Sequence, residues 1–125
     1  MNNDLVSRPA MTIDFKKNRI RIYKKTIHLI NNPEYILLLI NPREHTLAIL
    51  RGDCSDLREY RLPLIRLKGR KTFEITSKSL VRCLFDMCCN WTDKRLYHVY
   101  GNIKSNEGAV EFNLAESTEA CGRRG

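Results

Sequence analysis

Positively charged side chains are the residues of this sequence whose types and spacing point most clearly to a chemical task. The run from Lys16 to Lys25 holds six cations and no acidic residue, and a second group of cations lies between Arg58 and Lys71. Clusters of this kind favour a polyanion such as nucleic acid as the partner, because they neutralise phosphates. The residues that we expect to contact nucleic acid are Lys16, Lys17, Arg19, Arg21, Lys24, Lys25, Arg66, Lys68, Arg70 and Lys71.

The excess of positive charge lies in one part of the chain. The 125 residues hold 22 Lys and Arg against 14 Asp and Glu, a formal net charge of +8. Residues 1–53 carry nine basic and five acidic side chains, residues 54–71 carry six and two, and residues 72–125 carry seven of each. We therefore expect a nucleic acid to contact the first 71 residues. The same charge also suits an acidic surface of a partner protein, or a solvated face, and a homodimer is compatible with each.

The sequence lacks the motifs that mark common enzymes and metal sites. It has no glycine-rich phosphate loop, HExxH or GxSxG motif, and no paired-carboxylate motif. The five cysteines form no CxxC pair and the three histidines are scattered, whereas a zinc site needs ligands at defined spacing. We expect no enzyme activity, no cofactor and no metal. An odd number of cysteines favours reduced thiols and a cytoplasmic location.

Both ends of the chain read as tails. Residues 1–11 lack the charged and apolar regions of a secretory signal, and we expect them to form a flexible N-terminal tail. Residues 116–125 are polar and small, and we expect them to be disordered. No apolar run is long enough to cross a bilayer. We expect no membrane partner, although the basic clusters would also suit a membrane surface.

Hydrophobic periodicity predicts a strand, a helix and a hairpin in the first half of the chain. Arg19 to Tyr23 alternates basic and apolar residues, as a half-buried strand does. Lys24 to Asn31 is expected to form a short helix, which ends because Asn tolerates a left-handed cap and Pro33 cannot continue it. The apolar runs Tyr35–Ile40 and His45–Arg51 predict a hairpin at the centre of the fold.

The same order of elements is expected again in the second half. A strand over Thr72–Thr76 leads into a helix over Lys78–Cys89, for which Ser77 is a suitable N-cap. Strands over Arg95–Ile103 and Ala109–Leu114 then form a second hairpin. The predicted fold is therefore α+β: a duplicated strand–helix–strand–strand unit that forms one compact domain around two antiparallel hairpins.

These elements divide the chain into two units and a link between them. The first unit covers residues 12–52, the basic connector residues 53–71, with an edge strand around Tyr60–Leu62, and the second unit residues 72–115. Apolar position within an element predicts that four side chains are buried in the core: Leu38, Leu47, Leu84 and Phe85.

Tyrosines lie among the cations at two places, and bases stack on exposed aromatics of this kind. Tyr23 belongs to the first basic run and Tyr60 stands between Arg58 and Arg61. Packing against the core is the alternative role for both rings. If their strand is regular, Tyr97 and Tyr100 lie on opposite faces, so at most one of them is exposed.

The first half of the chain resembles the swapped-hairpin DNA-binding modules of the AbrB and SpoVT type, whose pattern is a Gly-Arg-Ile strand, an Ile-Pro-Lys helix entry and a hairpin. The strand of this pattern corresponds to Asn18-Arg19-Ile20-Arg21-Ile22, the helix to Lys24 to Asn31, and the hairpin to Tyr35 to Arg51. At the position of the family's proline this sequence has Tyr23. The resemblance covers residues 14–51, and two tandem copies would resemble the MraZ arrangement. It implies a regulatory protein that binds double-stranded DNA through Arg19, Arg21, Lys24 and Lys25.

Overall fold

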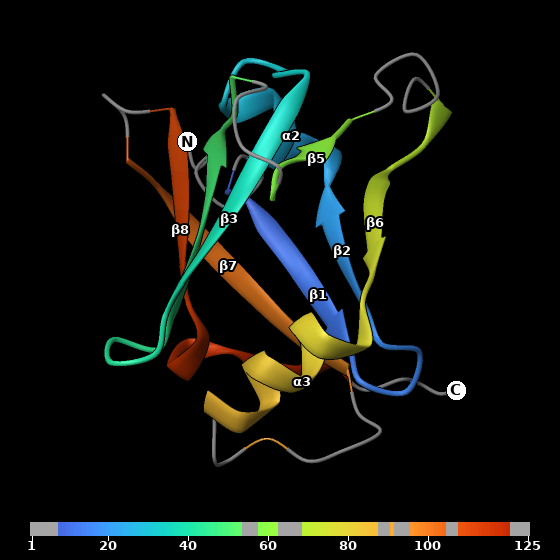
Figure 1. The fold of residues 1–125 in the computed structure, drawn as a ribbon, viewed down its shortest axis with the longest axis vertical. Coiled ribbons are helices and arrows are strands. Elements are labelled where there is room, and N and C mark those ends of the chain that lie inside the picture. Colours follow the sequence, from blue (N-terminus) through green and yellow to red (C-terminus); the bar gives the residue numbers. More distant parts are fainter. Residues whose placement is uncertain are drawn as a thin grey trace, which may run out of the picture.

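One curled antiparallel sheet forms the body of the protein. The computed structural model describes residues 8–53, 58–62, 69–87, 91, 96–104 and 108–120. The sheet bends around the core as a half-barrel, and two short helices, α2 (Lys24–Leu29) and α3 (Lys78–Met87), lie towards its opposite ends (Figure 1). The fold is therefore α+β, as the sequence predicts.

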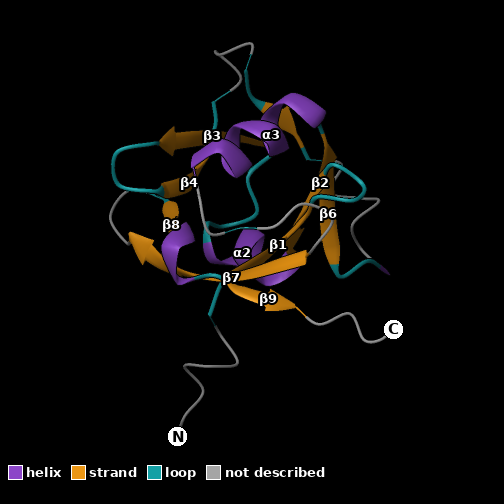
Figure 2. Ribbon diagram, turned by 90° about the horizontal axis from the view of Figure 1, so that it is seen from below, coloured by secondary structure: helices purple, strands orange, loops and turns teal. Residues whose placement is uncertain are grey.

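Within the described ranges the sheet has nine strands. They are β1 (Ala10–Asp14), β2 (Arg19–Tyr23), β3 (Tyr35–Asn41), β4 (Thr46–Arg51), β5 (Tyr60–Arg61), β6 (Thr72–Thr76), β7 (Leu96–Lys104), β8 (Ala109–Asn113) and β9 (Thr118–Ala120). Eight of them follow one path in the order β5-β3-β4-β8-β7-β1-β2-β6, and β9 pairs with β7. Seen from below in Figure 2, the strands surround the interior while α3 crosses the near end.

The long strand β7 joins the two halves of the sheet. Residues 96–100 pair with β1, whereas residues 101–104 pair with β8. Gly101 marks the change of partner: a Cβ at this position would lie 2.8 Å from the ring of Phe112. Glycine therefore allows the close packing that lets the sheet bend here.

The predicted order strand–helix–strand–strand occurs twice, as β2-α2-β3-β4 and as β6-α3-β7-β8. Strands of the two halves are neighbours at two places, because β2 pairs with β6 and β4 pairs with β8, both antiparallel. The predicted edge strand is present as β5, which pairs with β3 over two residues only. The first hairpin, β3-β4, consequently lies nearer to the edge of the sheet than the sequence suggests.

The inward side chains of both halves form one core. Leu47 and Leu84 are buried, as predicted. Leu38 and Phe85, which were also expected in the core, are only half-buried. Leu38 lies on β3 beyond the short β5, so the sheet does not cover it fully. Phe85 packs edge-to-face against the ring of Phe15 at 5.2 Å, and the guanidinium carbon of the exposed Arg82 lies 4.9 Å from the centroid of its ring.

The ends of both helices follow local rules of capping. The hydroxyl of Ser77 accepts a hydrogen bond from the backbone N–H of Leu80 at 3.2 Å, which confirms the predicted N-cap of α3. The helix α2 ends at Leu29, two residues earlier than expected, and Asn31 follows with a left-handed φ of 67°. Cys83 is exposed on α3, although its apolar surroundings in the sequence favour burial. The remaining cysteines, at positions 54, 88, 89 and 121, lie outside the described residues.

The strand β1 was not predicted from the sequence. Ala10 and Met11 were expected in the N-terminal tail, yet both belong to β1, which lies between β7 and β2, and Met11 is fully buried. Thr26 of α2 fixes the start of this strand: its hydroxyl accepts a hydrogen bond from Ala10 N–H at 2.9 Å and donates one to Ala10 C=O at 3.0 Å. Near the other end, β9 and part of the 3-10 turn η3 (Leu114–Glu116) lie within the expected C-terminal tail.

Candidate nucleic-acid interface

The turn between β1 and β2 presents the first two candidate cations. The carboxylate oxygen Oδ1 of Asp14 accepts hydrogen bonds from the backbone N–H groups of Lys16 and Lys17 at 3.0 and 3.1 Å. Asn18 completes the turn with a positive φ of 52°. The side chains of Lys16 and Lys17 are exposed at this turn.

Acidic side chains accompany both arginines of β2. Arg19 Nε lies 3.4 Å from Asp14 Oδ2, and Arg19 Nη1 lies 3.4 Å from Glu74 Oε1. Arg21 Nε donates a hydrogen bond to Glu74 Oε2 at 3.1 Å. Two cations therefore face two carboxylates, and this part of the sheet has no excess charge to offer to phosphates.

The other described candidates meet at the opposite end of β2. The backbone N–H of Lys24 donates a hydrogen bond to the carbonyl oxygen of Lys71 at 2.8 Å, because β2 and β6 run antiparallel and the end of one meets the start of the other. Lys25 and Arg70 are their chain neighbours. We call Lys24, Lys25, Arg70 and Lys71 the basic end.

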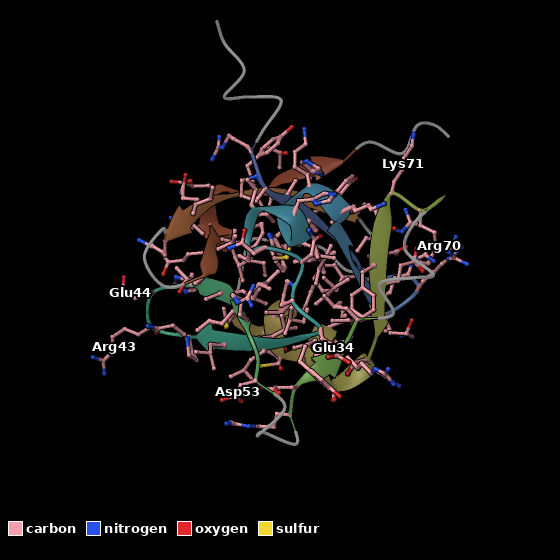
Figure 3. All side chains as sticks on the ribbon, turned by 90° about the horizontal axis from the view of Figure 1, so that it is seen from above. Glu34, Arg43, Glu44, Asp53, Arg70 and Lys71 are labelled. Carbon is pink, nitrogen blue, oxygen red and sulfur yellow. The ribbon has the colours of Figure 1, made fainter. Side chains whose placement is uncertain are left out.

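The side chains of the basic end are accessible. Lys24 is half-buried, and the other three residues are exposed. Within the described part of the chain, neither Arg70 nor Lys71 forms an ion pair. Figure 3 shows both side chains pointing outward beside β6, on the side of the molecule opposite to Arg43 and Glu44 of the β3–β4 turn.

The structure thus separates the predicted run of cations into different environments. The five residues of β2 place Lys16 and Lys17 about 16 Å from the basic end. Arg66 and Lys68, which were predicted to belong to the same surface, lie outside the described residues.

Aromatic side chains cover the outer face of the sheet beside the basic end. Tyr23 ends β2, and its ring meets the ring of His98 on β7 edge-to-face, with centroids 5.8 Å apart. The ring of His98 meets that of Tyr100 at 4.8 Å in the same manner. The guanidinium carbon of Arg8 lies 5.1 Å from the centroid of Tyr100. We call Arg8, Tyr23, His98 and Tyr100 the aromatic face.

A polar contact from β1 anchors this face. The hydroxyl of Thr12 lies 3.3 Å from the hydroxyl of Tyr23 and 3.2 Å from Nδ1 of His98, within hydrogen-bond distance of both. Thr12 is directly opposite His98 in the β1–β7 ladder, which explains the contact. Burial lowers the pKa of His98 from 6.5, because a desolvated imidazole is harder to protonate.

Only part of this face is predictable from the sequence. Tyr23 lies among cations there, and alternation along the strand predicts that at most one of Tyr97 and Tyr100 is exposed. Tyr97 is buried and Tyr100 is exposed, as that alternation requires. Arg8 and His98 were not expected here. The period of two along β7 places His98 and Tyr100 on one face, but their approach to Tyr23 depends on β1, which lies between their strands.

Neither a metal-ligand cluster nor a membrane-spanning helix is present among the described residues. They contain no group of three or more His, Cys, Asp or Glu side chains placed to hold a metal ion. Among these residues, no helix has the length and apolar character needed to span a membrane.

Comparison with family models, curated proteins and solved structures found no match to this chain.

Proposed function

We propose that this protein binds nucleic acid and that the basic end contacts its phosphates. The observation that carries the proposal is the hydrogen bond between Lys24 N–H and Lys71 C=O, which brings two basic segments of the chain together. Cations concentrated in this way release the counterions that surround a polyanion, and this release supplies affinity that decreases as salt increases.

Phosphate contacts position a protein on nucleic acid without reading its sequence. Duplex DNA, which the family resemblance implies, satisfies these contacts, and so does a single strand. Because Arg19 and Arg21 form ion pairs with carboxylates, we propose that they contribute less to phosphate binding than the family resemblance implies.

A salt titration tests the proposal. Binding of the protein to a fluorescein-labelled oligonucleotide is followed by anisotropy over a range of salt concentrations. With four cations engaged, the logarithm of the binding constant should fall against the logarithm of salt with a slope of about −3 to −4. Absence of binding at low salt would contradict the proposal.

A second candidate function is an interaction with a partner protein. It rests on the excess of positive charge, which suits an acidic surface of a partner protein as well as phosphates. The two functions differ in their response to bare DNA. If an immobilised DNA fails to retain the protein at low salt, the partner protein becomes the better explanation.

We further propose that the chain arose by duplication of a strand–helix–strand–strand unit. The repeated element order and the antiparallel pairs β2–β6 and β4–β8 support this view, since each pair joins equivalent strands of the two halves.

Two such halves share one core, so cleavage near Pro63 should leave two fragments that purify together. A stable, monomeric fragment ending near Asp53 would contradict the shared core.

A further inference from the structure

The aromatic face has the geometry of a surface that is prepared for flat ligands. Among the described large hydrophobic side chains, Tyr100 is the most exposed, at 47%. Tyr23 and His98 are half-buried, and edge-to-face contacts hold the three rings in fixed orientations. Rings that are already ordered lose little conformational freedom when a ligand stacks on them.

The backbone explains why the rings are accessible. Ala10 of β1 is directly opposite Tyr100 on one side. Met11 is opposite Ile22 on the other side, so the same register places Ala10 opposite Tyr23. A methyl group therefore lies between the two tyrosines, where a larger side chain would cover their rings.

Positive charge flanks this face on both sides. Arg8 stacks over Tyr100 at one edge. At the other edge, Tyr23 is opposite Thr72 in the β2–β6 ladder, directly beside Lys24 and Lys71 of the basic end. A strand of nucleic acid lying across the sheet would meet aromatic rings in the middle and cations at its margins.

We propose that the aromatic face stacks the bases of single-stranded nucleic acid while the basic end holds its phosphates. This inference rests on the proposed function and specifies the form of its ligand. Stacking requires unpaired bases, whereas a duplex offers protein side chains only the edges of its base pairs. Arg8 is then displaced from Tyr100 by a base and becomes available to a phosphate.

The lowered pKa of His98 agrees with this role. It favours the uncharged imidazole at neutral pH, and an uncharged ring stacks as an aromatic surface without adding a cation to the salt dependence.

Substitution of Tyr100 in the full chain tests the inference. A single strand of about 12 nucleotides, as DNA and as RNA, and the DNA duplex of the same sequence are compared by anisotropy. We expect Tyr100→Ala to weaken single-strand binding about 5- to 150-fold without changing the salt slope, and to leave duplex binding unchanged. Tyr100→Phe keeps the ring and should bind within about twofold of the wild type.

Two further variants make the result interpretable. Leu39→Ala is the matched control, since Leu39 is exposed to a similar degree on another strand. Tyr100→Leu retains apolar bulk without an aromatic ring, and replaces Tyr100→Ala if that variant unfolds. Both Tyr100→Leu and Tyr100→Ala should weaken single-strand binding.

The outcomes separate this inference from the proposed function. If Tyr100→Ala and Tyr100→Leu bind the single strand like the wild type, or lose affinity for strand and duplex equally, base stacking is wrong while phosphate binding remains. If neither strand nor duplex binds the wild-type protein at low salt, the proposed function itself fails, and the stacking inference with it.

Discussion

The backbone N–H of Lys24 lies 2.8 Å from the carbonyl oxygen of Lys71, in a hydrogen bond that extends the β2–β6 ladder by one residue pair. The contact turns two separate basic segments into one surface at the end of the sheet. It also distinguishes these residues from Lys16 and Lys17, which lie at the other end of β2.

Removal of charge from the basic end should weaken nucleic-acid binding more than the same removal elsewhere. The double variant Arg70→Ala, Lys71→Ala is expected to reduce the slope of the salt dependence by about two, because each lost phosphate contact removes about one unit. Lys16→Ala, Lys17→Ala removes the same charge from the distant turn. Equal losses in the two double variants would show that overall charge, rather than the basic end, determines binding.

Glu74→Gln should strengthen nucleic-acid binding. This change removes the carboxylate that both Arg19 and Arg21 contact. Arg19 keeps its contact with Asp14, so Arg21 is the arginine that becomes available to phosphates. The salt slope is expected to increase by about one. The effect on the free energy of unfolding should stay within about 1 kcal/mol, since exposed ion pairs contribute little.

The control for Glu74→Gln is Glu111→Gln. Glu111 is similarly exposed and pairs with Lys104 at 3.4 Å, on the second hairpin. An equal gain in affinity for both variants would indicate that the loss of negative charge alone is responsible, and not the release of Arg21.

Leu84→Ala should destabilise the fold strongly. Leu84 is fully buried on the inner side of α3, and a cavity of this kind costs about 2–5 kcal/mol. Phe85→Ala should lower the free energy of unfolding by less than the same substitution of a fully buried phenylalanine would, because Phe85 is half-exposed. Chemical denaturation measures both changes, with Leu39→Ala as the surface control. A larger loss for Phe85→Ala than for Leu84→Ala would contradict the packing of α3.

Acid should reduce the stability of the protein through His98. Folding lowers the pKa of this residue from 6.5, so the unfolded chain binds the proton more tightly than the folded chain. The contribution of His98 to the free energy of unfolding is therefore constant well above pH 6.5 and becomes less favourable as the pH falls below that value.

This pH dependence is measurable as the thermal midpoint at about pH 7.5 and about pH 5. The decrease between them should be smaller in His98→Gln than in the wild type, whereas His28→Gln, at an exposed position on α2, serves as the control. An identical decrease in His98→Gln and the wild type would rule out His98 as its source.

The elements that could be predicted from the sequence are those whose signals lie within a few neighbouring residues. The alternation of Arg19 to Tyr23 and the capping hydroxyl of Ser77 are properties of neighbouring residues, and the structure confirms the strand and the helix start. The strand β1 could not be predicted in this way, because Thr12 and Asp14, on its outer face, are polar residues near the chain terminus. Both are buried by contacts with distant strands, to His98 and Arg19.

The candidate site depends on how distant strands pair. The individual helices and strands depend more on their own neighbouring residues. Arg19 and Arg21 read as free cations in the sequence, but the β2–β6 register places Arg21 opposite Glu74. The aromatic face likewise exists only because β1 lies between β7 and β2. No periodicity within one segment carries this information. The charge of single residues could therefore be predicted from the sequence, but not whether their side chains are available to phosphates.

Mapping the bound oligonucleotide by amide chemical shifts tests the central claim most directly. The isotope-labelled protein is titrated with a single strand of about 12 nucleotides at low salt. We predict the largest shifts at Tyr23–Lys25, Arg70–Thr72 and His98–Tyr100, and unchanged signals at Arg43 and Glu44 on the opposite side of the molecule. Shifts centred on the β3–β4 turn, or spread evenly over the surface, would contradict binding at the basic end.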